Sequence, residues 1–266
     1  MHATPPLMVF SDLDGTLLDH ETYDWSPASE ALAALKTCGA GLVLASSKTS
    51  VEIGGLRGEL GVSDWPAIVE NGAGILPPHT REVADRSRYM ALREVLDGLP
   101  EELRAPFTGF GDATAEEVAS MTGLSRDGAT AAKLRAFSEP GLWEGSEDRK
   151  ADFIEALKAK GVTAQQGGRF LTLSFGQNKA DRVKDLMSAY RPAHTVALGD
   201  APNDAEMLET AEFGVIIPNP HGKTLAPLLG EETGRIIRAT APGPSGWNSA
   251  ILELVSRLGL AQNGKQ

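Results

Sequence analysis

The chain has 266 residues, of which 41% are hydrophobic, so it can bury a substantial core in one large domain or two smaller ones. Its formal net charge of -11 argues against a nucleic-acid or anionic-membrane partner, because such partners favour clustered Lys and Arg. The single cysteine, Cys38, cannot form an internal disulfide, and neither a basic leader nor an apolar stretch of membrane-spanning length is present. We therefore expect a cytoplasmic protein, of unknown oligomeric state.

The first part of the chain predicts a strand over residues 7–10, a helix over 27–37 and a strand over 41–45. Both strands are apolar without alternation. This pattern is typical of strands that are buried on both faces of a parallel sheet covered by helices.

The middle of the chain has a different pattern, which begins after a turn at Pro77 and Pro78. The sequence then predicts two strands on either side of the Gly167-Gly168 pair, which favours a tight hairpin turn. We interpret residues 82–176 as an inserted α+β domain. Its predicted helices cover residues 89–99, 115–121 and 151–160, and its predicted strands cover residues 162–166 and 169–175.

The last part of the chain returns to the first pattern, with helices over 180–190 and 205–210 and apolar strands over 195–198 and 214–217. Residues 1–81 and 177–266 are therefore predicted to form one α/β domain around a Rossmann-like parallel sheet. Ligands of such sheets bind beyond the carboxyl ends of the strands. Residues 11–16, 46–49 and 199–204 are therefore expected to carry the chemistry.

Two carboxylates, Asp12 and Asp14, directly follow the first predicted strand. Crowded carboxylates repel each other unless a cation or a shared proton intervenes. A hard cation such as Mg²⁺ would satisfy them and would leave room in its coordination shell for a substrate phosphate. An isolated Asp-x-Asp-Gly sequence is also common in turns, so the interpretation needs support from elsewhere in the chain.

That support comes from three later segments in the same order as the motifs of one superfamily. The segment around Asp12 resembles the signature of haloacid dehalogenase phosphatases, Ser46 resembles their second motif and Lys179 their third. Residues 199–208 resemble the fourth. The resemblance implies a Mg²⁺-dependent phosphatase in which Asp12 is the nucleophile and forms an aspartyl-phosphate, while Asp14 is the general acid and base. Ser46 would hydrogen-bond the phosphoryl group.

The same resemblance implies how the cation is held. Asp12, the main-chain carbonyl of Asp14 and Asp200 would bind the metal, and Lys179 would supply a fixed positive charge. Asp204 has three open roles: a direct ligand, a partner of a metal-bound water, or a group that orients Lys179. Taken singly, an Asn-Asp pair often caps a helix, and Lys179 would be an ordinary surface lysine.

A narrower resemblance concerns the substrate. The insertion between the second and third motifs resembles a type II α/β cap. The chain is similar to the mannosyl-3-phosphoglycerate phosphatase family in residues 46–49, 70–73, 138–140, 199–204 and 243–248. This implies a substrate with a sugar, a glycerate carboxylate and a phosphate monoester. Glucosyl-3-phosphoglycerate and general sugar phosphates remain alternatives, as does a non-catalytic module that binds metal or phosphometabolites. One departure is that Lys179 is flanked by Asn178 and Ala180, where relatives usually have an acidic residue or glycine.

A doubly anionic substrate needs polar and basic groups in addition to Lys179. Ser46, Lys48 and Arg169 are candidates because Lys48 follows the second strand and Arg169 adjoins the Gly-Gly hairpin. Asn71 is a further candidate through its amide. The alternatives are solvated surface charges for the two basic residues and an ordinary Asn-Gly turn for Asn71.

Overall fold

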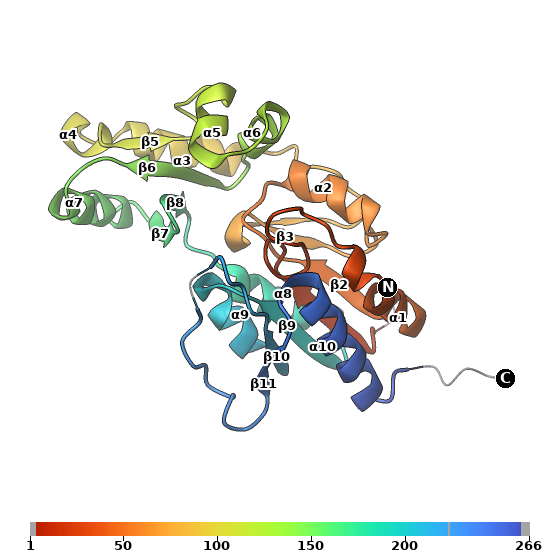
Figure 1. Cartoon of the computed structure of the whole chain (residues 1–266). Coiled ribbons are helices and arrows are strands. Elements are labelled where there is room, and N and C mark those ends of the chain that lie inside the picture. The colour runs from red at the N-terminus through yellow and green to blue at the C-terminus, as the bar shows by residue number, and fades with distance from the viewer. Residues whose placement is uncertain (1–3, 223, 262–266) are drawn as a thin grey trace. The chain divides into compact units, whose positions relative to one another are not determined.

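The computed structural model describes residues 4–222 and 224–261, and the chain forms two compact units (Figure 1). The core unit comprises Met1–Ser46, Asp64–Ile68 and Lys179–Gln266, and the second unit comprises Ser47–Ser63 and Val69–Asn178. The second unit thus contains more of the chain than the range 82–176 expected for the insertion. Its role as a cap stays a prediction, and residues 1–3, 223 and 262–266 of the expected core lie outside the described part.

The core unit is built on a five-stranded parallel sheet with the order β11-β10-β9-β1-β2. The predicted α/β class and the strands predicted for this sheet are confirmed, whereas β11 was not predicted. The side chains of β1 are buried along its whole length, which explains why its sequence is apolar without alternation. The strands are β1 (Leu7–Ser11), β2 (Gly41–Leu44), β9 (His194–Gly199), β10 (Phe213–Ile216) and β11 (Ile236–Arg238).

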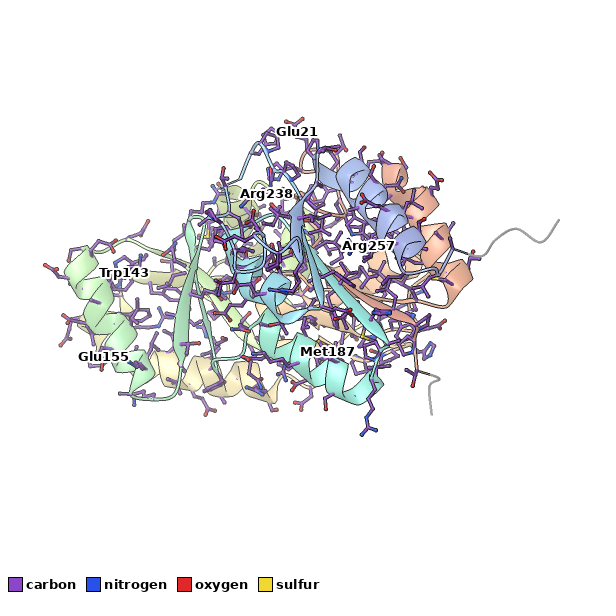
Figure 2. All side chains as sticks on the ribbon, turned by 90° about the horizontal axis from the view of Figure 1, so that it is seen from below. Glu21, Trp143, Glu155, Met187, Arg238 and Arg257 are labelled. Atoms are coloured by element: carbon purple, nitrogen blue, oxygen red, sulfur yellow. The ribbon has the colours of Figure 1, made fainter. Side chains whose placement is uncertain are left out.

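Helices cover both faces of this sheet. Helix α1 contacts α10, and α8 contacts α9. Figure 2 shows α8, which carries Met187, and α10, which carries Arg257, on opposite faces of the sheet. Among the described residues, no helix has the length and apolar character needed to cross a bilayer. The helices are α1 (Ser29–Cys38), α8 (Lys179–Tyr190), α9 (Ala205–Thr210) and α10 (Gly243–Arg257), with 3-10 turns η1 (Ser26–Ala28) and η3 (Pro202–Asp204).

The register of β1 determines where the site lies. Ser11 is paired with Leu44 of β2 on one side and with Leu198 of β9 on the other. Because all of these strands run in parallel, the residues that follow them meet at one edge of the sheet. Asp12, Ser46 and Asp200 all come from that edge.

The second unit contains a four-stranded antiparallel sheet with the order β5-β6-β8-β7. The predicted hairpin is confirmed as β7 and β8, and Gly168 in its turn has a φ of 56°. The strands of this sheet are β5 (Phe107–Gly109), β6 (Ser138–Trp143), β7 (Thr163–Gly167) and β8 (Phe170–Ser174). Two short strands lie on either side of the turn η2 (Glu70–Gly72): β4 (Gly74–Leu76) and β3 (Ala67–Val69), of which only Val69 belongs to the second unit.

Two hydrophobic clusters stabilise the second unit. The larger joins α3 and α7 to the antiparallel sheet through residues such as Leu92, Phe153 and Leu173. The smaller joins α5 and α6 to the loop after β5 through Phe110, Val118 and neighbouring alanines. The helices of this unit are α2 (Ser50–Glu59), α3 (Ser87–Asp97), α4 (Glu101–Arg104), α5 (Ala115–Thr122), α6 (Arg126–Ala132) and α7 (Glu147–Lys158).

Candidate active site

The turn after β1 places Asp12 at the edge of the sheet. The main-chain N–H of Asp12 donates to the carbonyl of Leu198, which extends the β1–β9 pairing by one residue. Gly15 then turns the chain with a φ of 82°, a value that favours glycine. A Cβ atom on Gly15 would lie 2.5 Å from Nδ2 of Asn219 and 3.1 Å from a carboxylate oxygen of Asp200. Glycine at this position therefore allows both the turn and the close approach of the Asn219 and Asp200 side chains to the backbone of Gly15.

Three buried carboxylates meet at this edge. Asp12, Asp200 and Asp204 each offer an oxygen, and these atoms all lie within 4.8 Å of one another. Burial raises the pKa of Asp12 well above its ordinary value, and the charge of Lys179 only partly offsets this. Burial likewise raises the pKa of Asp200. Carboxylates that are buried together repel one another, so this set of oxygen ligands suits a divalent cation.

Lys179 contributes a positive charge to this cluster of carboxylates. Its side chain is 2% exposed, and Nζ lies 2.5 Å from Oδ1 of Asp12 and 2.7 Å from Oδ1 of Asp204. Burial alone would lower the pKa of Lys179, but the charges of the two carboxylates outweigh it and keep the pKa above its ordinary value. Lys179 is therefore charged at neutral pH, at the first residue of α8.

Asp204 is held by the protein through both of its oxygens. Besides the bond from Lys179 to Oδ1, its Oδ2 accepts hydrogen bonds from the backbone N–H groups of Asp200 and Ala201, at 3.3 and 3.2 Å. Gly199 permits this approach, because a Cβ atom there would lie 2.5 Å from Cβ of Asp204. Asp204 thus links the end of β9 to Lys179.

Two polar side chains that the sequence did not single out hold Asp200. Thr16 Oγ1 donates to Oδ1 of Asp200 at 2.9 Å, and Asn219 Nδ2 donates to Oδ2 at 2.7 Å. Thr16 lies within the segment that follows β1, whereas Asn219 follows β10 in a Pro-Asn-Pro sequence. The signal for Asn219 in the sequence is its place directly after the apolar strand predicted over residues 214–217.

The remaining predicted residues of the core unit lie at the same edge. Ser46 is buried two residues beyond the end of β2, and its N–H donates to the carbonyl of Ile68. Asp14 is half-buried in the turn after β1, where it forms an isolated β-bridge with Leu18.

Three predicted substrate-binding residues belong to the second unit. The carbonyl of Lys48 accepts from the N–H of Glu70, and Asn71 has a φ of 57° in the turn between β3 and β4. Arg169 is exposed at the β7–β8 hairpin, where its guanidinium lies 5.3 Å from the ring centre of Phe170. These residues come from separate loops, and their roles stay predictions.

Glu70 is a buried carboxylate of the second unit that the sequence did not explain. Its Oε1 accepts from the N–H of Ala136 at 2.8 Å, and its Oε2 accepts from the N–H and the Oγ of Ser138 at 2.8 and 2.7 Å. Arg135 lies beside it, with Nε 3.4 Å from Oε2, and donates through Nη1 to the carbonyl of Ser47. Glu70 therefore ties the loop before β6 to the turn that contains Asn71.

Comparison with known proteins agrees with this arrangement. The family model for haloacid dehalogenase-like hydrolases matches residues 9–98 and 128–226, which is more than half of the chain. The fold is similar to that of the sucrose-phosphatase from Synechocystis sp. PCC6803, solved with sucrose and phosphate, with 17% identity, a TM-score of 0.60 and coverage of 96% of this chain and 98% of that one.

Two further solved structures share the fold. A subclass IIB sugar phosphatase of the same superfamily has 16% identity and a TM-score of 0.60, with 95% of this chain and 99% of that chain covered. A haloacid dehalogenase-like hydrolase from Bacteroides thetaiotaomicron has 20% identity and a TM-score of 0.63, with 93% and 98% covered. The family match together with the shared fold leads to one conclusion: the chain belongs to the haloacid dehalogenase-like hydrolases.

Proposed function

We propose that this protein is a Mg²⁺-dependent phosphatase that hydrolyses mannosyl-3-phosphoglycerate to mannosylglycerate and phosphate through an aspartyl-phosphate on Asp12. The observation that carries the proposal is the pairing of Lys179 with both Asp12 and Asp204 at the carboxyl edge of the sheet. A buried carboxylate beside a fixed ammonium suits nucleophilic attack on a phosphate, because the ammonium can stabilise charge on the phosphoryl oxygens.

The first chemical step uses Asp12 and Asp14. A carboxylate oxygen of Asp12 attacks phosphorus, the bond from phosphorus to the sugar-glycerate oxygen breaks, and Asp14 donates a proton to that leaving oxygen. In the second step Asp14 takes a proton from water. The resulting hydroxide attacks phosphorus and releases Asp12 and phosphate.

The surrounding residues stabilise both steps. Lys179 balances charge on the transferring group, Ser46 donates a hydrogen bond to it, and Asp204 orients Lys179. A Mg²⁺ ion bound by Asp12, Asp200 and the carbonyl of Asp14, with Asp204 completing the acidic cluster, would offset the repulsion between nucleophile and phosphate.

The sugar-glycerate part of the proposal rests on the sequence segments similar to the mannosyl-3-phosphoglycerate phosphatase family. Ser46 would hydrogen-bond the phosphoryl group, and Lys48 and Arg169 would supply positive charge for the anionic groups of the substrate. The amide of Asn71 would hydrogen-bond the sugar or the substrate phosphate. The sucrose-phosphatase and sugar phosphatase folds support a second candidate, a phosphatase of broader sugar-phosphate range or of glucosyl-3-phosphoglycerate.

The deciding experiment is phosphate release from synthetic mannosyl-3-phosphoglycerate, with and without Mg²⁺, beside glucosyl-3-phosphoglycerate, mannose 6-phosphate and 3-phosphoglycerate. We expect a metal-dependent preference for the first compound. Turnover of hexose phosphates alone would support the phosphatase activity but would exclude mannosyl-3-phosphoglycerate as the substrate.

The non-catalytic alternative has a separate test. Asp12→Asn keeps the shape of the side chain and replaces the nucleophilic carboxylate by a neutral amide, so we expect phosphate release to fall at least about 1,000-fold. Wild-type turnover in that variant would reject Asp12 as the nucleophile. No turnover of any phosphate ester by the wild-type protein would favour a module that binds metal or phosphometabolites.

A further inference from the structure

A buried tryptophan of helix α10 forms a hydrogen bond with the residue that precedes Asp12. Trp247, in α10, is 0% exposed, and its Nε1 donates to Oγ of Ser11 at 2.9 Å. Ser11 is the last residue of β1 and is also fully buried. The indole therefore forms its hydrogen bond immediately before Asp12.

The hydroxyl of Ser11 also forms a second hydrogen bond, to the main chain of Asp12. Its Oγ lies 2.7 Å from the main-chain carbonyl oxygen of Asp12. An indole N–H can only donate and a carbonyl can only accept, so the hydroxyl accepts from Trp247 and donates to Asp12. Hydrogen bonds in such a buried chain strengthen one another. We call this chain, Trp247 to Ser11 to the Asp12 carbonyl, the indole relay.

The indole relay completes the anchoring of the Asp12 main chain. The N–H of Asp12 is held by the carbonyl of Leu198, and the carbonyl of Asp12 is held by Ser11. Together these bonds fix both peptide groups that flank the Asp12 α-carbon. The direction of the Asp12 side chain follows from these two peptide planes, because the backbone dihedrals set where Cβ points.

The segment over residues 243–248 fixes the indole in turn. A Cβ atom on Gly246 would lie 1.9 Å from the carbonyl oxygen of Ala241, so the first turn of α10 packs directly on that backbone. Asn248 Oδ1 accepts from the N–H of Ala31 at 2.9 Å, which ties α10 to α1. These contacts of Gly246 and Asn248, the residues on either side of Trp247, hold the tryptophan in place within the Gly-Pro-Ser-Gly-Trp-Asn sequence.

We propose that Trp247 is a positioning residue that acts through Ser11 to hold Asp12 in the orientation needed for attack on phosphorus. The inference rests on the proposed phosphatase function. A nucleophile displaced by about 1 Å can lose up to about 100-fold in rate, so a carbonyl that is free to rotate behind Asp12 lowers kcat. Substrate affinity depends on other groups and should change little.

The test compares Trp247→Phe, Ser11→Ala and the double variant. Trp247→Phe keeps most of the buried ring and deletes the donor, and Ser11→Ala deletes the middle of the relay. We expect each to lower kcat by about 10-fold with KM unchanged, and we expect the double variant to match the more severe single variant. The matched control is Trp65→Phe, the same chemical change beside Gly41 and Tyr190, which should retain wild-type kcat.

A second measurement separates positioning from stability and needs no substrate. Beryllium fluoride with Mg²⁺ mimics a phosphoryl group on an aspartate, and its binding is followed by the shift of the thermal midpoint. Relay variants should bind it at least about 10-fold more weakly, in proportion to their loss of kcat. A purely structural role would lower the midpoint of the free protein but leave kcat and beryllium fluoride affinity at wild-type values, and that result overturns the proposal.

The outcomes remain distinguishable from a failure of the proposed function. If Trp247→Phe does not fold, Ser11→Ala decides by the same two measurements. If the wild-type protein hydrolyses no phosphate ester, the proposed function fails, and equal beryllium fluoride affinity in Ser11→Ala and wild type then rejects the relay separately.

Discussion

The ammonium of Lys179 lies between two carboxylates, 2.5 Å from that of Asp12 and 2.7 Å from that of Asp204. Replacing it by Lys179→Met keeps most of the side-chain volume and removes the charge. We expect kcat for phosphate release to fall by about 100- to 1,000-fold, because the charge on the phosphoryl oxygens loses its fixed partner. Lys184→Met, at an exposed position of the same helix, is the control. A change in kcat of less than twofold in Lys179→Met would reject the electrostatic role.

The two hydrogen bonds to Asp200 predict a change in metal requirement. Thr16→Val and Asn219→Ala each release one of its oxygens. We expect the Mg²⁺ concentration for half-maximal activity to rise about 10- to 100-fold, with kcat at saturating Mg²⁺ less affected. The measurement is a Mg²⁺ titration of phosphate release. Thr37→Val, at an exposed position of α1, is the control, and a wild-type titration curve in both test variants would contradict the prediction.

The buried carboxylate of Glu70 predicts a loss of stability. In Glu70→Gln one acceptor oxygen becomes a donor that faces backbone N–H groups, and Arg135 loses its ionic partner. We expect the free energy of unfolding to fall by about 3–5 kcal/mol, measured by chemical denaturation. Glu94→Gln, at an exposed position of α3, should stay within about 0.5 kcal/mol of wild type. Equal losses in the two variants would refute this role for Glu70.

Asp112 predicts a dependence of stability on acidic pH. Burial alone would raise its pKa, but hydrogen bonds from Arg93, Arg104 and the N–H of Gly109 outweigh it and hold the pKa below the ordinary value of 3.8. A carboxyl with a lowered pKa in the folded state stabilises the fold above its unfolded pKa, and loses this effect as the pH falls through the folded pKa.

The measurement for Asp112 is chemical denaturation at several pH values. Asp112→Asn should be less stable than wild type at pH 7, and the difference should shrink as the pH falls below about 3.8. A difference that stays constant from pH 7 to pH 2 would show that the charge is not responsible.

The core sheet and most of the candidate site could be predicted from sequence because both depend on local patterns. Strands buried on both faces are uniformly apolar, and the polar residues that follow them stand out by contrast. Asp12, Asp200 and Asp204 belong to such segments, whereas Lys179, the first residue of α8, was indicated only by its place among the motifs of the superfamily. The structure brings all four residues together.

Two elements that the sequence did not predict, β6 and α10, have local sequences that favour turns. Strand β6 contains Pro140 and Gly141, which normally indicate a turn, yet it lies between two other strands. Helix α10 begins with a Gly-Pro-Ser-Gly sequence that also favours a turn, although proline is well suited to the first turn of a helix. In both elements, contacts with distant parts of the chain determine the conformation. No local pattern carries that information.

The register of β1 also has a consequence for biosynthesis. Leu7 of β1 is paired with His194 of β9. Because these residues are far apart in the sequence, β1 cannot pair with β9 until most of the chain has left the ribosome. Until then β1 has an unpaired, apolar edge on the side that β9 will occupy, and such an edge is prone to aggregation. Long-range parallel pairing of this kind is also slow to form. Turnover of substrate therefore reports on completed folding of the core unit, and a nascent or truncated chain that ends before β9 has no pre-assembled site.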